Sequence, residues 1–101
     1  MITRIWHGRT SLDNHESYLQ FLLGEGTREY LQTAGNLSVK VLREIKDDCC
    51  HFWTVTEWVD IQSIKAFAGE DCEKAVYYPE DEGVLLEFEE KVIHAETFQV
   101  K

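Results

Sequence analysis

Residues 50–59 read Cys-His-Phe-Trp-Thr-Val-Thr-Glu-Trp-Val, and this stretch decides the fold class. β-Branched and aromatic residues dominate it, which is typical of a β-strand. The turn sequence Lys46-Asp47-Asp48 precedes the strand, and before that turn apolar residues alternate with polar ones over residues 37–45. Two strands joined by a short polar turn form a hairpin. The centre of the chain is therefore predicted to be a β-hairpin.

A helical pattern precedes the hairpin. Asp13 and Glu16 have the spacing of a capping box, and apolar residues then recur at intervals of three and four, which gives a helix one buried stripe. Gly24 and Gly26 interrupt the stripe, so we expect a kink or a break there. Gly35 can take a positive φ and is expected to end the helical region before the hairpin.

Another helical pattern follows the hairpin. Asp60 is placed to cap a helix that ends at Gly69, and a short helical piece is expected over residues 71–78. Strands are expected at residues 2–7 and 92–100. The order of elements is β-α-β-β-α-β. This order predicts an α+β, ferredoxin-like antiparallel sheet with both helices on one face.

Length and charge limit the class of protein. The chain has 101 residues, and we expect one domain, residues 1–101, because this length supports a single hydrophobic core. With 10 Lys and Arg against 19 Asp and Glu, the formal charge is −9, which argues against nucleic acid or a membrane surface as a partner. No apolar run is long enough to cross a membrane. No secretory signal follows Met1, so we expect a cytoplasmic protein.

The cysteines indicate neither a disulfide framework nor a metal site. Cys49 and Cys50 are adjacent and therefore point to opposite faces of a strand, and Cys72 makes the count odd. Zinc sites space their cysteines differently. The acidic turn over residues 80–83 lacks the ligand spacing of a calcium loop. We expect reduced thiols, no metal and no cofactor.

Both faces of the predicted sheet carry apolar residues. Along the strand 50–59, Phe52 and Trp58 lie on one face, whereas Trp53 and Val55 lie on the other. The helices can cover only one face, so the opposite face needs another cover. A second copy of the same sheet is the simplest cover. We therefore predict a homodimer that forms through the sheet face away from the helices.

Several stretches resemble the antibiotic-biosynthesis-monooxygenase-like domains of the dimeric α+β barrel superfamily. They are Ile5-Trp6-His7-Gly8-Arg9, Thr56-Glu57-Trp58-Val59-Asp60, Ala66-Phe67-Ala68-Gly69, Tyr77-Tyr78-Pro79-Glu80-Asp81 and the strand that contains His94. The resemblance covers essentially the whole chain. It implies a dimeric α+β barrel with one of two activities, which are oxidation of phenols by dioxygen without a cofactor and the binding and degradation of haem.

The haem pattern fits this sequence less well than the oxygenase pattern. Phe67 occupies the position of its Trp, Tyr77 that of its His, and His7 that of its first-strand Asn. Haem is therefore a lesser alternative. The resemblance implies a cofactor-independent monooxygenase acting on a small aromatic or polycyclic compound. The alternative from another class is a non-catalytic dimeric module that binds a small molecule or responds to stress.

Strand alternation places the candidate site residues. We place His7 toward the helices, on the same face as Thr56 and Trp58. There His7 would act as the base that deprotonates a phenol, and Tyr77 would orient the substrate oxygen. The residues expected to bind the substrate are Trp58, Phe67, Tyr78 and Thr56. The alternative for His7 is an ordinary strand residue whose ring bonds a neighbouring carbonyl group.

His94 and Glu96 form a secondary candidate site. They lie two residues apart on one strand face, so the carboxylate could orient the imidazole and raise its pKa. The alternative, which we favour, is a hydrogen bond that stabilises the rim of the barrel. The two other histidines, His15 and His51, are expected to be solvated.

Overall fold

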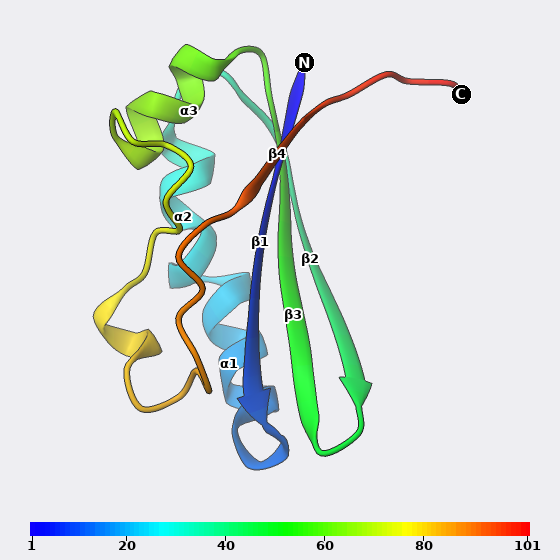
Figure 1. Cartoon of the computed structure of the whole chain (residues 1–101), viewed down its shortest axis with the longest axis vertical. Coiled ribbons are helices and arrows are strands. Elements are labelled where there is room, and N and C mark those ends of the chain that lie inside the picture. The colour runs from blue at the N-terminus through cyan, green and yellow to red at the C-terminus, as the bar shows by residue number, and fades with distance from the viewer.

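The computed structural model describes all 101 residues and contains one four-stranded antiparallel sheet with the helices on one face (Figure 1). The strands are β1 (Ile2–Ser11), β2 (Asn36–Lys46), β3 (Cys49–Trp58) and β4 (Ile93–Glu96), in the spatial order β2-β3-β1-β4. The helices are α1 (His15–Leu23), α2 (Glu25–Gln32) and α3 (Ile61–Ala68), and short 3-10 helices cover Leu12–Asn14 and Pro79–Asp81. The predicted ferredoxin-like α+β fold is confirmed.

The turns around the central hairpin follow the sequence. β2 and β3 pair in antiparallel register, and Asp47 in the turn between them has a φ of 58°. Gly35, before β2, has a φ of 92°, and a Cβ atom there would collide with the side chain of Ser63. The expected break in the first helical region falls at Gly24, which separates α1 from α2.

The two predicted helix caps differ in outcome. Asp60 caps α3 as predicted, because its Oδ1 accepts a hydrogen bond from the Ser63 backbone N–H at 2.9 Å. The predicted capping box of Asp13 and Glu16 is wrong. The 3-10 turn places Asn14 immediately before α1, and no side chain caps that helix.

The chain between α3 and β4 is mostly irregular. The helix predicted over residues 71–78 is absent. This segment is held by buried side chains instead, among them Cys72, Asp81 and Leu85, whose spacing follows no helical period. Leu85 forms an isolated bridge with Thr10, so the segment runs beside the second half of β1.

The last strand is shorter than predicted. β4 covers Ile93–Glu96 instead of residues 92–100, and it pairs with the first residues of β1. The C-terminal tail then leaves the sheet and extends away from the rest of the chain (Figure 1). Phe98 in this tail is 78% exposed, because no other part of the chain covers it.

The register of β1 shows that the predicted orientation of His7 is wrong. Trp6 pairs with Thr54 on β3, and both residues are buried against the helices. His7 pairs with Trp53, so both lie on the opposite face, which no helix covers. Strand alternation separates the two faces but cannot say which one is covered. Arg4 decides it, since this residue is only 1% exposed and faces the helices.

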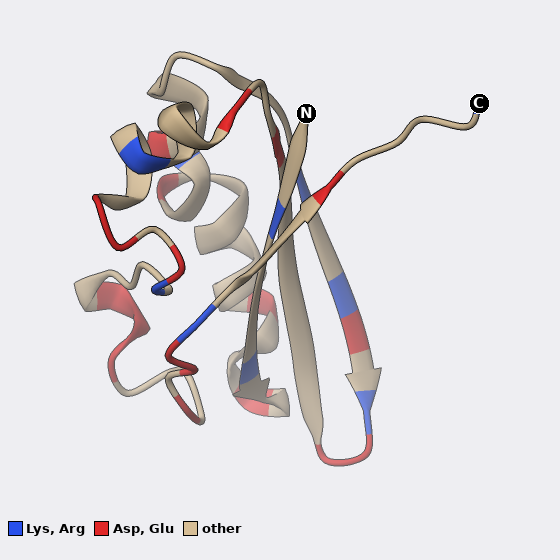
Figure 2. Cartoon of the chain, turned by 45° about the horizontal axis from the view of Figure 1, so that its top comes forward, with Lys and Arg blue, Asp and Glu red and all other residues tan.

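Acidic residues are distributed unevenly along the chain. Asp and Glu gather along the irregular segment between α3 and β4 (Figure 2). No helix is both long and apolar enough to span a membrane. No three His, Cys, Asp or Glu side chains are arranged to hold a metal ion, and all three cysteines are unpaired.

The two caps give a matched test of the fold. Asp60→Ala should lower the free energy of unfolding by about 1 kcal/mol, because a helix N-terminus loses its side-chain acceptor. Asp13→Ala should leave it unchanged, because no helix N–H depends on that carboxylate. Urea unfolding followed by circular dichroism measures both. Equal losses in the two variants would contradict the assignment of the caps.

Candidate functional site

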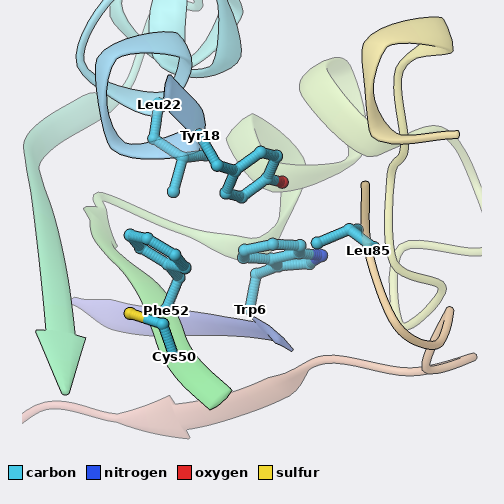
Figure 3. Close-up of a cluster of buried hydrophobic side chains, with 6 residues drawn as sticks. All are labelled: Trp6, Tyr18, Leu22, Cys50, Phe52 and Leu85. Atoms are coloured by element: carbon cyan, nitrogen blue, oxygen red, sulfur yellow. The ribbon is translucent and has the colours of Figure 1, made fainter. Parts of the chain in front are cut away.

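Aromatic side chains fill the layer between the sheet and the helices. One buried cluster is shown in Figure 3, where the Tyr18 ring and Leu22 lie above Phe52 and Trp6. Its six residues are Trp6, Tyr18, Leu22, Cys50, Phe52 and Leu85. Gly8 belongs to this packing, because the indole of Trp6 lies where a side chain at position 8 would be. On the sheet side, Trp6 and Phe52 thus supply the aromatic surface of this cluster.

A small cavity of about 10 Å³ lies in this layer. A volume of this size holds about one water molecule. Its lining residues are Trp6, Tyr18, Phe21, Leu22, Gly26, Tyr30, Thr54, Val76, Tyr78 and Asp81. The cavity is aromatic and apolar with a few hydroxyl groups, which is the composition expected from the sequence, but it is too small for any larger ligand.

Three tyrosine hydroxyls supply most of the polarity around the cavity. Tyr18 donates to Asp81 Oδ1 at 2.8 Å, and the Tyr30 hydroxyl lies 3.1 Å from Thr54 Oγ1. Burial raises the pKa of Tyr18, Tyr30 and Tyr78 above the ordinary tyrosine value. All three therefore stay protonated near neutral pH. They present neutral hydroxyl groups to a ligand.

Asp81 is the acidic group of the cavity wall. Its Oδ1 accepts the Tyr18 hydroxyl, and its Oδ2 accepts the backbone N–H of Tyr78 at 2.7 Å. Burial raises the pKa of this carboxyl group above its ordinary value, and the two hydrogen bonds oppose the shift. Asp81 thus ties the irregular segment to α1. It is also the ionisable group of the wall whose pKa moves toward neutrality.

Two buried N–H groups in this layer have no hydrogen-bond partner. They are the indole Nε1 of Trp6 and the Nε of Arg4, both on the helix face of β1. The other nitrogens of Arg4 are satisfied by the carbonyl oxygens of Cys72 and Lys74 and by the imidazole of His94. Buried donors without acceptors are uncommon in folded proteins. The Trp6 N–H is therefore a buried donor without an acceptor in this layer.

Two open grooves flank the closed cavity and share its walls. A groove of about 230 Å³ includes Tyr18 and Phe21, and one of about 420 Å³ includes Tyr78. The larger groove also contains Tyr77 and Phe88, whose rings meet edge to face. The same side chains thus separate the closed cavity from open space on two sides.

The predicted catalytic residues lie on opposite sides of the sheet. Tyr77 packs edge-on against Trp6 on the helix side, and its hydroxyl donates to the backbone oxygen of Glu89 at 2.6 Å. His7 lies on the open face, where its Nδ1 is 2.6 Å from Glu89 Oε2. Glu89 therefore contacts both residues. Their catalytic roles stay a prediction, but one ligand on the helix side could not touch His7 directly.

The residues predicted to bind substrate lie in two separate places. Tyr78 lines the cavity. Trp58, Phe67 and Thr56 lie in a second cluster farther along the sheet, where the Trp58 Nε1 donates to Thr56 Oγ1 at 2.8 Å and Phe67 packs against Tyr30. Because these polar groups satisfy each other, this cluster presents no free donor to a ligand.

His94 and Glu96 do not form the predicted pair. The ring of His94 lies 2.8 Å from the guanidinium of Arg4, and no hydrogen bond joins it to Glu96. Burial lowers the pKa of His94, with a further decrease caused by Arg4. The less favoured of the two interpretations, in which Glu96 raises this pKa, is therefore wrong. Arg4 on β1, instead of the carboxylate of Glu96, is the hydrogen-bond partner of His94.

Sequence reasoning missed several residues of the cavity. Tyr18 falls on the apolar stripe of the first helical region, which marks it as a core residue, and Asp81 belongs to the acidic turn over residues 80–83. The signal for Asp81 is weak, because its acidic neighbours make it look like part of an exposed rim. Arg4 carried a clearer signal, since a lone cation sits among β-branched and aromatic residues of an expected strand.

Tyr18→Phe tests the Tyr18–Asp81 contact. It should lower the free energy of unfolding at pH 7 by about 1.5 to 3 kcal/mol, the usual contribution of a hydrogen bond to a charged group. The hydrogen bond favours ionised Asp81, so its contribution is lost as the pH falls through the raised pKa of that carboxyl group. Urea unfolding at pH 7 and pH 4 measures the difference. Tyr78→Phe is the control, because the Tyr78 hydroxyl reaches only exposed Glu29 at 3.5 Å. A loss of stability in Tyr18→Phe that is as large at pH 4 as at pH 7 would contradict the assignment.

Comparison with known proteins gives a likeness in fold. No protein-family model matches the chain, and no curated protein sequence matches it. Among solved structures, a Bacillus cereus protein described as a candidate antibiotic biosynthesis monooxygenase superposes with a TM-score of 0.68 at 10% sequence identity. The match covers 99% of this chain and 97% of that one. The chain therefore has the fold of the antibiotic-biosynthesis-monooxygenase-like domains.

Proposed function

We propose that the protein binds a small aromatic compound in the layer between the sheet and helices α1 and α2. The cavity ringed by Trp6, Tyr18, Tyr30 and Tyr78 is the observation that supports this function most directly. Aromatic walls suit a flat apolar ligand, and neutral hydroxyl groups suit its oxygen atoms. The Trp6 N–H, which has no partner in the chain, would then donate to a ligand oxygen.

Binding requires the cavity to open. About 10 Å³ cannot hold an aromatic ring, whereas the adjoining grooves of about 230 and 420 Å³ can. Tyr18, Phe21 and Tyr78 separate these spaces, and Tyr78 belongs with Asp81 to the irregular segment between α3 and β4. Movement of this segment away from α1 would join the cavity to the grooves. Hydrogen bonds of Asp81 to Tyr18 and Tyr78 hold it closed in the absence of ligand.

The reaction that we propose is oxygenation without a cofactor. A phenolic substrate would transfer its proton to Asp81, whose carboxyl group is buried in the cavity wall. The resulting phenolate is electron-rich enough to reduce dioxygen at a neighbouring carbon. One oxygen atom would end in the product as a carbonyl group and the other would leave as water, so that a CH₂ carbon supplies all four electrons. Tyr78 would donate a hydrogen bond that orients the substrate oxygen, and Tyr77 would do so once its hydroxyl leaves the backbone oxygen of Glu89.

A binding module without turnover is the second candidate function. It is favoured by the closed cavity and by the hydrogen bonds that already occupy most of its polar groups. In that case the same aromatic layer would hold a ligand without activating it. The two candidates share the binding site and differ in whether dioxygen is consumed.

We also propose that the functional unit is a homodimer formed through the open face of the sheet. An apolar patch runs across this face and consists of Ile5, Leu42, Trp53, Val55 and Ile93. Leu42 is 48% and Ile93 61% exposed in the single chain. An apolar sheet face open to water favours association. A second copy would cover this patch with an identical one around a two-fold axis.

Oxygen uptake with an anthrone or a hydroquinone tests the proposed reaction. We expect consumption above the buffer rate, with at least about a tenfold loss in Asp81→Asn and a smaller one in Tyr77→Phe, because removal of a general base typically costs 10²- to 10⁴-fold. Quenching of tryptophan fluorescence measures binding separately. Binding without uptake would support the module and exclude the oxygenase.

His7→Ala identifies the face that the ligand uses. His7 lies on the open face, so its loss should leave uptake and binding by the helix-side cavity within about twofold. A large loss in His7→Ala with no loss in Asp81→Asn would move the site to the open face. Circular dichroism of each variant controls for folding.

Analytical ultracentrifugation tests the dimer. The wild-type chain should sediment as a dimer at micromolar concentration, and Ile93→Lys should sediment as a monomer, because a buried unpaired ammonium group opposes association. Leu31→Lys, which introduces the same charge at an exposed site on α2, is the matched control and should remain dimeric. A wild-type monomer would exclude the proposed assembly.

A further inference from the structure

A chain of hydrogen-bonding side chains crosses one end of the open sheet face. Glu89 Oε2 lies 2.6 Å from His7 Nδ1, and His7 Nε2 lies 2.9 Å from His51 Nδ1. His51 Nε2 in turn lies 3.8 Å from the sulfur of Cys49. The four groups come from β1, β3 and the irregular segment. None of them contacts the helix-side cavity, because the sheet lies between.

One assignment of the ring protons gives every hydrogen bond in this row of side chains both a donor and an acceptor. The Glu89 carboxylate accepts the Nδ1–H of His7, which leaves His7 Nε2 as an acceptor. His51 then donates its Nδ1–H to His7, so His51 Nε2 is also an acceptor. That nitrogen faces the Cys49 thiol and can take its proton. The arrangement is a nucleophile, a base and two groups that orient the base.

A cation stands on the other side of the sulfur. Arg9 Nη1 lies 3.6 Å from Cys49 Sγ, and its Nε and Nη2 are both held by Glu87 at 2.7 Å. This ion pair fixes the guanidinium in place beside the sulfur. The Lys46 carbonyl oxygen, at 3.7 Å, is the remaining polar neighbour of the thiol. Arg9 and a protonated His51 would together stabilise a thiolate.

We propose that Cys49 is a nucleophilic thiol that reacts with hydrogen peroxide. The thiolate attacks one oxygen of the peroxide, the S–O bond forms and the O–O bond breaks. The departing hydroxide takes the proton held by His51 and leaves as water. Sulfur is oxidised to a sulfenic acid, and the peroxide is reduced.

The other two cysteines serve as internal comparisons. Cys50 points to the helix side, and burial raises the pKa of its thiol. Cys72 is buried on that side as well. Neither sulfur contacts a histidine ring, and the Cys50 thiol donates to the backbone oxygen of His51 at 3.8 Å instead. Cys49 begins β3 at the hairpin end of the open face and is as little exposed as Cys72, at 8% against 7%, so the histidine and arginine beside its sulfur, and not its exposure, distinguish it.

The experiment treats the full chain with hydrogen peroxide and dimedone, and mass spectrometry measures the labelling rate of each cysteine peptide. At pH 7 we expect Cys49 to react at least about tenfold faster than Cys50 and Cys72. His51→Gln should slow Cys49 by about tenfold or more. At pH 9.5 the Cys49 rates of the wild type and of His51→Gln should agree within about threefold, because hydroxide ion then replaces the histidine as the base.

His15→Gln is the matched control, because His15 is a histidine outside this chain of groups and its loss should leave the Cys49 rate unchanged. If His51→Gln does not fold, Glu89→Gln gives the same readout with a smaller loss, since it weakens only the orientation of His7. Equal labelling of the three cysteines, or equal rates in His51→Gln and His15→Gln at pH 7, would overturn the proposal.

Discussion

The guanidinium of Arg4 fixes which way β1 faces. A buried cation is costly unless acceptors surround it. Here the carbonyl oxygens of Cys72 and Lys74 and the ring of His94 accept its hydrogen bonds, and Phe67 packs against it at 5.5 Å. These partners come from α3, the irregular segment and β4. One side chain on the first strand therefore joins parts of the chain that are some 60 to 90 residues away, and it does so only if Arg4 points toward the helices.

Strand alternation carries this orientation along β1 and gives the two sheet faces different chemistry. Trp6 must follow Arg4 to the helix side, where hydroxyl groups are neutral and the walls are aromatic. His7 and Arg9 must take the open side, where imidazole rings, carboxylates and a thiol form one network. The proposed ligand site and the proposed reactive thiol thus have separate places in a chain of 101 residues. Only Glu89 touches both sides.

Local signals were enough to predict most of the fold and little of the site. The hairpin, the cap at Asp60 and the break at Gly24 depend on neighbouring residues, so the sequence shows them directly. Which side of β1 is turned toward the helices depends on Arg4. The acceptors of Arg4 are distant backbone carbonyls, which no sequence periodicity predicts. The same holds for Asp81, which looks like one more exposed acid until Tyr18 covers it. The candidate site lies where these long-range contacts meet. The sequence therefore predicts an aromatic, apolar site but identifies only a few of its residues.

Glu89 limits how independently the two faces can change. The Tyr77 hydroxyl donates to its backbone oxygen, while its carboxylate holds His7. If a ligand displaces Tyr78, Tyr77 either moves Glu89 with it or breaks that hydrogen bond. A neutral hydrogen bond contributes about 1 kcal/mol, whereas burying about 100 Å² of aromatic ligand surface contributes about 2.5 kcal/mol. The free energy of ligand burial can therefore exceed that of the Tyr77–Glu89 hydrogen bond. This hydrogen bond favours the arrangement without ligand but does not prevent a ligand from entering.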